Sequence, residues 1–187
     1  MISFKRVSSR DELQQIKTLQ EANHLSQLSS TPQGLSEGFL TARYSLDFLE
    51  EMHRAEPSVI AVEQDRVIGY ALATTRKPGM QNPLLAALFE QIDRLTYRGT
   101  PLSDINYLVV GQLCIGNGYR GRGLAPSLYN HYQQALHEKY PCCLTDIDLR
   151  NQPSLKAHLK AGFKEISSFS YGSADWSIVL WDWRGNT

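Results

Sequence analysis

The stretch of residues 105–125 reads INYLVVGQLCIGNGYRGRGLA and contains the strongest strand pattern of the chain. Its first part, residues 105–115, is rich in β-branched and other apolar residues and predicts a strand. A glycine-rich turn follows, and a helical pattern then runs from about residue 123 to residue 139. The first N–H groups of a helix are unpaired and carry partial positive charge, and glycines let an anion approach them closely. Because Arg120 and Arg122 add positive charge, this stretch predicts a phosphate-binding site.

The sequence on both sides of this stretch alternates between strand and helix patterns. Further strands are predicted at residues 2–7, 59–62, 67–73, 143–149, 163–171 and 176–184, and further helices at residues 9–28, 46–54, 82–95 and 153–161. Residues 29–34 are a loop by composition. The second and third strands flank a short polar turn and form a hairpin, whereas helices separate later strands. The expected fold is α/β (α+β), a single domain over residues 1–187 with a mixed sheet and helices on both faces.

The composition is typical of a soluble globular protein, with 42% hydrophobic and 20% charged residues among 187. The formal net charge is zero, which argues against nucleic acid as a partner. No apolar run approaches the roughly 20 residues that span a bilayer, and the first residues lack a signal peptide's apolar core, so no membrane partner is expected. Cys114, Cys142 and Cys143 give neither a disulfide framework nor zinc-site spacing. We therefore expect reduced, mostly buried thiols, no metal, and a cytoplasmic location.

Three kinds of phosphate-binding turn can be compared with this glycine pattern. A P-loop needs Lys followed by Ser or Thr where Arg122 and Gly123 stand, so that interpretation fails. A dinucleotide-binding turn fits better, because residues 116–121 read GNGYRG and the next strand carries Asp146 and Asp148. An NAD-binding oxidoreductase fold needs several more parallel strands, however, and fewer than forty residues follow Asp148. The preceding hairpin also argues against it.

The third interpretation uses the spacing Arg120-x-x-Gly123-x-Ala125, which resembles the phosphate-binding turn of the GNAT superfamily of acetyl-CoA-dependent N-acyltransferases. Residues 151–163, NQPSLKAHLKAGF, are similar to that family's second signature, in which an Asn leads a helix that ends in Gly-Phe. The order of elements also matches, so the resemblance covers nearly the whole chain. It implies a mostly antiparallel sheet whose fourth strand, 105–115, splays from the fifth to admit the acetyl-pantetheine arm.

The resemblance also implies which residues contact the co-substrate acetyl-CoA. In the family, backbone N–H groups at the end of the fourth strand stabilise the oxyanion, and the glycine turn binds the phosphates. The residues expected to bind acetyl-CoA are Leu113, Cys114, Ile115, Arg120, Gly121, Arg122, Gly123, Leu124, Ala125, Asn151 and Ser154.

Acetyl transfer to an amine requires proton removal, because a lysine-like amine has a pKa of about 10.4 and is protonated at neutral pH. Many family members place a tyrosine acid in the second-signature helix, where this chain has His158, either as the acid or as a bystander. The fourth strand offers no glutamate base. Asp146 stands in an apolar strand, where a carboxylate is costly without a purpose, so it is the candidate base or the anchor for a cationic amine. Alternatively, Asp146 and Asp148 cap turns or pair with arginines.

The acceptor pocket of the family is built from the first two helices and the loops around them, which here implies Glu37, Phe39 and Tyr44. The predicted helix at 82–95 either covers that pocket or forms a dimer surface, so a homodimer stays open. The acceptor is a small molecule, a peptide N-terminus or a protein lysine. The expected function is an N-acetyltransferase, and the alternative is a non-catalytic module that binds acyl-CoA as a ligand or sensor.

Overall fold

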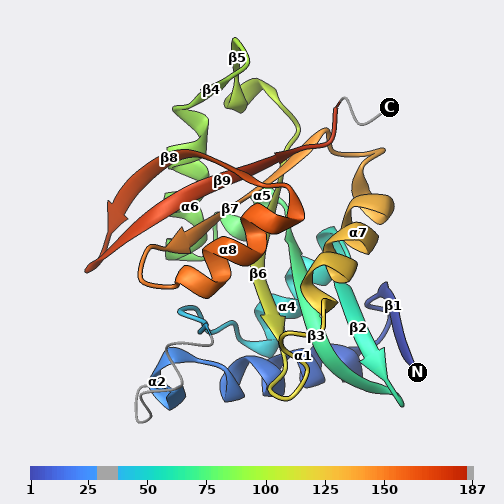
Figure 1. Cartoon of the computed structure of the whole chain (residues 1–187). Coiled ribbons are helices and arrows are strands. Elements are labelled where there is room, and N and C mark those ends of the chain that lie inside the picture. The colour runs from blue at the N-terminus through green and yellow to red at the C-terminus, as the bar shows by residue number, and fades with distance from the viewer. Residues whose placement is uncertain (29–37, 185–187) are drawn as a thin grey trace.

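A seven-stranded sheet crosses the molecule in the computed structural model, which describes residues 1–28 and 38–184 (Figure 1). The strands follow the order β1-β2-β3-β6-β7-β9-β8. Their bounds are β1 (Ile2–Arg6), β2 (Val59–Glu63), β3 (Arg66–Thr74), β6 (Leu108–Ile115), β7 (Cys142–Asp148), β8 (Lys164–Tyr171) and β9 (Ala174–Asp182). Every neighbouring pair is antiparallel except β6 and β7. The mixed, mostly antiparallel sheet is thus confirmed, and the mainly parallel sheet of an NAD-binding oxidoreductase is excluded.

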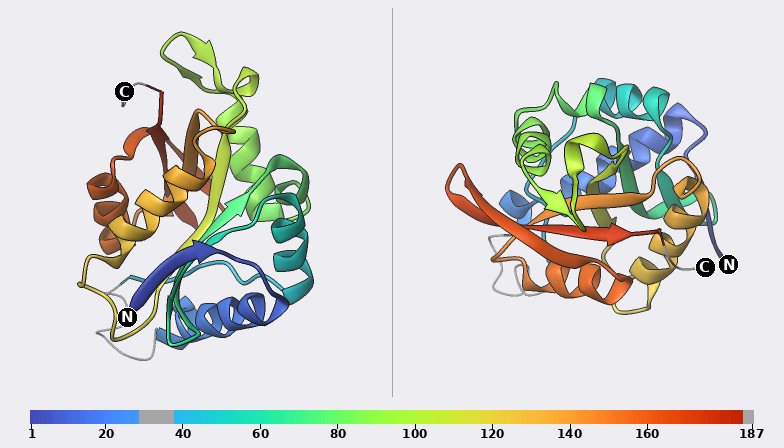
Figure 2. Two further views of the ribbon diagram at one scale, coloured as in Figure 1. Left: turned by 90° about the vertical axis from the view of Figure 1, so that its right-hand side faces the viewer. Right: turned by 90° about the horizontal axis from the view of Figure 1, so that it is seen from above.

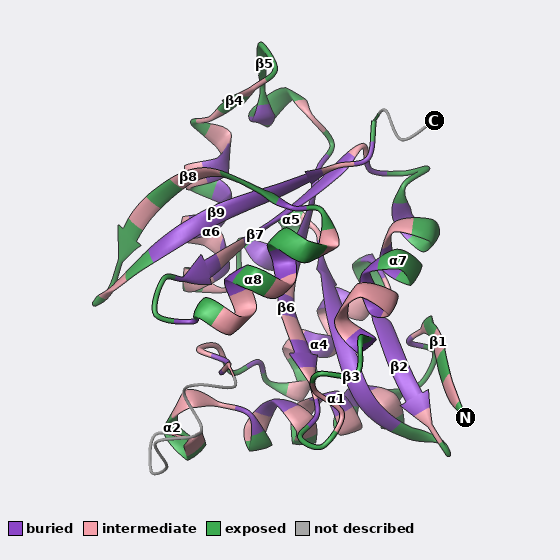
Figure 3. Ribbon diagram, viewed as in Figure 1, coloured by how far each residue is buried: buried purple, intermediate pink, exposed green. Residues whose placement is uncertain are grey.

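Helices cover both faces of the sheet, as predicted (Figure 2). One core holds the buried sides of α1 (Arg10–Ala22), α4 (Leu46–Ala55) and α6 (Pro83–Asp93). The other holds those of α7 (Leu124–Leu136) and α8 (Gln152–Ala161). The other elements of the described chain are short: α2 (Leu25–Leu28), α5 (Arg76–Gly79), the 3-10 helix η1 (Leu102–Asp104), and the hairpin of β4 (Thr96–Tyr97) and β5 (Thr100–Pro101). The central strands lie between two helical layers and are mostly buried (Figure 3).

The helix predicted at residues 9–28 is interrupted in the structure. α1 ends at Ala22, and the short helix α2 follows it. Between them, the Asn23 side chain donates to the carbonyl of Leu19 at 2.8 Å, and the Asn23 carbonyl accepts from the N–H of Leu40 at 3.0 Å. Asn23 therefore ends the helix by bonding to its own last turn and to a distant segment of the chain.

The strand predicted at residues 105–115 begins three residues late, because β6 starts at Leu108. The residue before it, Tyr107, is fixed by its side chain instead. Its hydroxyl accepts from the Arg76 guanidinium at 3.0 Å and donates to the Asp93 carboxylate at 3.1 Å. These contacts connect α5 and α6 to the start of β6, so Tyr107 is held by its side chain and not by strand pairing.

The helix predicted at residues 82–95 is α6, and its apolar side faces the core. Leu85, Leu88 and Phe89 are buried against the sheet. Of the two alternatives for this helix, their burial supports a cover over the acceptor side and not a dimer surface, although Leu84 is only partly buried. The three cysteines are free and buried, as predicted. None of the described helices is long and apolar enough to cross a membrane.

The splay predicted from the family resemblance is present between β6 and β7. The two strands pair only at Leu108 with Cys143 and at Val109 with Leu144, although both strands continue well beyond those residues. The Thr145 hydroxyl donates to the Val110 carbonyl at 2.8 Å. Beyond this bond the strands diverge, and the open edge of β6 faces a gap in the middle of the sheet.

Candidate active site

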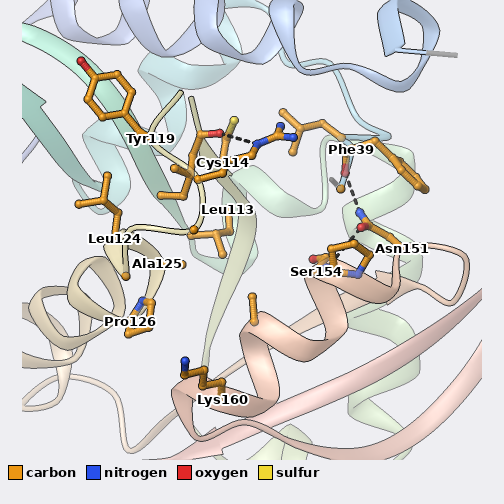
Figure 4. A pocket seen from close by; sticks show the side chains of 18 residues that line it. Phe39, Leu113, Cys114, Tyr119, Leu124, Ala125, Pro126, Asn151, Ser154 and Lys160 are labelled. Atoms are coloured by element: carbon orange, nitrogen blue, oxygen red, sulfur yellow. Dashed lines mark hydrogen bonds between the residues drawn. The ribbon is translucent and has the colours of Figure 1, made fainter. Parts of the chain in front are cut away.

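A cavity of about 300 Å³ lies where β6 and β7 separate (Figure 4). Its walls come from the end of β6, the glycine turn, the start of α7 and one side of α8. The lining residues include every predicted cofactor contact except Arg122: Leu113, Cys114, Ile115, Arg120, Gly121, Gly123, Leu124, Ala125, Asn151 and Ser154. Two sequence signatures that are distant in the chain thus meet around one space.

The glycine turn leaves the N-terminus of α7 open toward this cavity. Gly118, Gly121 and Gly123 all have positive φ, at +83°, +73° and +75°, a conformation that side-chain-bearing residues rarely adopt. A Cβ placed on Gly121 or Gly123 would have no atom within 4 Å, so the space in front of the turn is unfilled. Gly123 is the N-cap of α7 and offers no side-chain bond to the first N–H groups. Those N–H groups therefore remain available to an anion.

The two arginines of the turn do less for this cavity than the sequence suggests. Arg120 lines it, but its guanidinium donates to the Ile115 carbonyl at 3.2 Å and to the Asn23 side chain at 2.6 Å, so it braces the turn against α1. Arg122 is not among the lining residues and lies over the Tyr119 ring at 5.5 Å. The predicted contact between Arg122 and the cofactor therefore has no support in this geometry.

A cation that the sequence analysis missed comes from α8. Lys160 lines the cavity together with Pro153, Ser154 and Ala157, which lie on the same side of the helix. The spacing of three to four residues that places them together is visible in the sequence. It could have identified Lys160, because that helix side also carries Ser154, a predicted contact.

The open edge of β6 directs backbone donors into the gap. The N–H of Gly116 donates to the Ile68 carbonyl on β3 at 2.8 Å, and backbone groups alternate sides along a strand. Leu113 and Ile115 therefore turn their N–H and C=O groups away from β3, toward the gap. The bond from Arg120 to the Ile115 carbonyl lies on that side. The N–H groups of Leu113 and Ile115 match the predicted oxyanion donors.

Asn151 holds the wall between the two halves of the site. It is the N-cap of α8, and its Oδ1 accepts from the Ser154 N–H at 3.3 Å. Its Nδ2 donates to the Phe39 carbonyl at 2.8 Å, which ties α8 to the chain ahead of α4. Because both ends of the amide are bonded within the protein, Asn151 shapes the cavity by positioning Phe39 and Ser154.

A second, smaller cavity of about 70 Å³ adjoins the first. The two share Phe39, Leu40, Leu113, Asn151 and Ser154. The second is also lined by Thr41, Ala42, Tyr44, Leu84, Leu85, Gly111, Gln112, Thr145, Asp146, Ile147, Asp148, His158 and Trp176. It therefore brings together both predicted catalytic residues and two of the three predicted acceptor residues. Glu37, the third, lies outside the described residues, as does the predicted loop at 29–34.

Asp146 and Asp148 have opposite environments in this second cavity. Asp148 is bound by the guanidinium of Arg150 at 2.6 Å, and this partner holds its pKa below the usual range although burial opposes the shift. Asp146 has no arginine partner among the described residues, and its buried Oδ2 accepts no hydrogen bond. Burial raises the pKa of Asp146 to about 7. Arginine pairing therefore accounts for Asp148 and leaves Asp146 as the candidate functional carboxylate.

His158 is a neutral imidazole in this structure. Its Nδ1 lies 2.8 Å from the Ser154 carbonyl, which can only accept, so Nδ1 carries the proton and Nε2 has a lone pair. Burial lowers the pKa of His158 to about 4, and the ring packs against Tyr129 and Phe163. A general acid needs a proton to donate near neutral pH. The acid role of His158 stays a prediction, and this geometry favours the bystander alternative.

Replacing His158 with phenylalanine should therefore change kcat by less than about threefold, below the usual range for general acid–base groups. It should also alter stability in acid. A histidine whose folded pKa lies near 4 resists protonation, so the wild-type protein loses stability as the pH falls from about 6.5 to about 4. The Phe variant should lose less over that interval. Unfolding curves at pH 7 and pH 4.5, with kcat at pH 7, check both effects; a kcat loss of a hundredfold would restore the acid role.

A buried polar network connects the acceptor side to β6, and the sequence analysis missed it. The Gln112 Oε1 accepts from the Gln20 amide at 3.0 Å and from the Tyr70 hydroxyl at 2.6 Å, and its Nε2 donates to the Ala42 carbonyl at 3.0 Å. The Tyr44 hydroxyl donates to the Gly111 carbonyl at 2.9 Å. A glutamine in an otherwise apolar strand was the available signal. These bonds fix the chain around residues 42–44 against the strand that lines both cavities.

Comparisons with known proteins agree with this geometry. The chain matches the sequence profile of the Acetyltransferase (GNAT) family over residues 19–163. Among curated protein sequences, none matches the chain.

Several solved structures share the fold over nearly their whole length. The NatC complex bound to Gag peptide and CoA gives a TM-score of 0.66 at 15% identity, covering 97% of this chain and 98% of that chain. Arabidopsis thaliana NAA60 in complex with acetyl-CoA gives 0.64 at 15% identity, covering 97% and 99%. The ribosomal-protein-S18-alanine N-acetyltransferase from Escherichia coli gives 0.62 at 10% identity, covering 97% and 94%. At such identities the likeness establishes the fold.

Proposed function

The chain belongs to the acetyltransferase (GNAT) family, and we propose that it moves the acetyl group of acetyl-CoA to a primary amine by direct attack on the thioester. The observation that carries this proposal is the pair of adjoining cavities where β6 and β7 separate. One contains the open glycine turn, and the other contains the unpartnered Asp146 carboxylate oxygen. We further propose that residues 1–187 form one N-acetyltransferase domain.

The first cavity has the properties that acetyl-CoA requires. The pyrophosphate of acetyl-CoA would lie at the N-terminus of α7. There Gly121 and Gly123 leave space, and the first N–H groups of the helix have no side-chain cap. Lys160 provides a cation on the opposite wall for another phosphate. Two of the similar structures hold this kind of molecule, since NatC has CoA and NAA60 has acetyl-CoA.

Asp146 is the proposed acceptor of the amine proton. Its pKa of about 7 leaves a substantial ionised fraction at neutral pH, and the same burial lowers the pKa of an ammonium beside it, which favours the proton transfer. Transfer of the proton to Asp146 converts two buried charges into two neutral groups. The amine lone pair is then free to attack the thioester carbon. The C–N bond forms and the C–S bond breaks, the nitrogen of the new amide gives its second proton to the leaving thiolate, and Asp146 releases the first proton to solvent.

The N–H groups of Leu113 and Ile115 are the proposed donors to the thioester oxygen as negative charge develops there. A covalent acetyl-cysteine route is disfavoured, because burial raises the pKa of the neighbouring Cys114 to about 12 and keeps it as a thiol. Direct attack within one ternary complex is therefore the simpler proposal.

Acetyl-CoA at a hundredfold excess over its Kd should stabilise the folded protein by about 2.7 kcal/mol, which raises the melting temperature, whereas NADH should not. With an accepted amine, the protein should also release free thiol. Thermal unfolding with each nucleotide and a thiol assay over a panel of amines check these expectations. Stabilisation by acetyl-CoA without thiol release would identify a binding module. Stabilisation by NADH alone would contradict the proposed co-substrate.

A further inference from the structure

We propose that the acceptor is a primary ammonium on an uncharged, apolar body, and that the site discriminates against amines with a neighbouring carboxylate, such as free amino acids. This inference rests on the proposed function and concerns the second cavity. It follows from three properties of the described lining residues: their charges, their free polar atoms and their apolar surfaces.

The charges favour a cation and offer nothing to an anion. Asp146 brings a buried carboxylate oxygen without a hydrogen-bond partner to this wall. The charge of Asp148 is balanced by Arg150. No lysine or arginine is among the described residues that line the cavity, and His158 is neutral. An amino-acid carboxylate would therefore face Asp146 without a compensating cation.

Three neutral polar side chains that line the cavity, those of Gln112, Tyr44 and Thr145, are already engaged. Both ends of the Gln112 amide are bonded within the protein, and the Tyr44 hydroxyl donates to Gly111. The Thr145 hydroxyl donates to Val110. A substrate body with hydroxyl or carboxylate groups would lose its hydration in this cavity and gain few bonds in return.

The remaining surface suits an alkyl group beside an ammonium. Leu84 and Leu85 of α6 form one wall, and Trp176 of β9 lies on the wall that also contains Asp148, its cross-strand neighbour. Phe39 closes the side toward the first cavity. Aromatic faces attract a nearby ammonium, while leucines favour an apolar body. Leu84 and Leu85 thereby make α6 one of the elements that determine which acceptor fits.

Four amines that share one branched skeleton separate these contributions: isobutylamine, valinamide, threoninamide and valine. Their kcat/KM values, expressed per free amine, are measured by thiol release with saturating acetyl-CoA. Valinamide should exceed valine by at least about tenfold, because like charges placed together in a shielded site repel. It should exceed its isostere threoninamide by about tenfold or more, because an apolar pocket discriminates against an added hydroxyl. The ratio of the kcat/KM values of isobutylamine and valinamide shows whether the acceptor is a free alkylamine or a peptide N-terminus.

The outcomes separate this inference from the proposed function. Valine or threoninamide used as well as valinamide would overturn the inference and leave N-acetyl transfer intact. Binding of acetyl-CoA without acetylation of any of the four, or of a wider panel of lysine and polyamine acceptors, would overturn the proposed function. Acetylation of polyamines or lysine, with none of the four used, would overturn the inference alone.

Discussion

Replacing Asp146 with asparagine is expected to lower kcat by about 10²–10⁴-fold, the usual contribution of a general base. Asparagine preserves shape but accepts no proton. In the wild-type protein, kcat/KM should fall below about pH 7, because Asp146 must be ionised to act and burial raises its pKa to about 7. The variant should lack that acidic limb. A pH–rate profile of both proteins checks the expectation.

A different kinetic result would reassign Asp146. If it anchors a cationic amine without taking its proton, the variant should mainly raise the KM of the amine and keep kcat. Wild-type kinetics with unchanged pH dependence would remove Asp146 from the site. Proton removal would then fall to ordered water and backbone carbonyls, or to Glu37.

The same substitution should stabilise the fold in a pH-dependent way. An acid whose folded pKa lies above its unfolded value binds more protons in the folded state, so the wild-type protein loses stability as the pH rises from about 4 to about 7. A pKa raised from 3.8 to about 7 corresponds to at most about 4 kcal/mol. The buried asparagine amide offsets part of this gain, by about 1–3 kcal/mol if it finds no partner.

The matched comparison is Asp148→Asn, which should change stability in the opposite direction. Asp148 is paired with Arg150 and its pKa is lowered, so its ionised form stabilises the folded state above pH 4. Unfolding free energies of both variants at pH 5 and pH 8 test the contrast. An effect of Asp146→Asn on the unfolding free energy that is the same at pH 5 and pH 8 would show that Asp146 carries no burial penalty, because the cost of the asparagine amide does not depend on pH.

The parts of the site that depend on local backbone chemistry could be predicted from the sequence. Gly121 and Gly123 take left-handed conformations ahead of a helix, and their spacing in the chain is enough to indicate this. The strand that ends at Ile115 could also be predicted from the sequence, because it is a long apolar run. The boundary near Asn23 was missed, because its bond to Leu40 depends on a distant segment.

Side-chain directions could not be predicted in the same way. Arg120 and Arg122 flank one glycine, yet Arg120 braces the turn against α1 and Arg122 lies over Tyr119. Asp146 and Asp148 share one face of β7, and what separates them is the guanidinium of Arg150, which bonds to Asp148. Asp146 lies in a cavity whose walls come from several elements, and its burial there raises its pKa. The bond from Arg120 to Asn23 and the burial of Asp146 depend on distant parts of the chain, and no local pattern contains them.

Replacing Gly123 with glutamate is expected to weaken acetyl-CoA binding by at least about a hundredfold while the protein stays folded. A carboxylate would enter the unfilled space before the N-terminus of α7, where the pyrophosphate would lie. Two like charges about 4–5 Å apart at an effective dielectric constant near 20 repel by about 3–4 kcal/mol, which corresponds to more than a hundredfold in Kd. Isothermal titration with acetyl-CoA measures the change.

Gly172→Glu is the matched control for that substitution. Gly172 lies in the turn between β8 and β9 with φ +61°, and a Cβ there, as at Gly123, would meet no atom within 4 Å. Both variants therefore add the same charge and the same left-handed strain, about 1–2 kcal/mol for a residue with a side chain. Their melting temperatures should fall by similar amounts, whereas acetyl-CoA affinity should fall only in the Gly123 variant. Equal affinity in the two folded variants would place the phosphates away from this turn, because the backbone strain and the added charge are common to both and position alone differs.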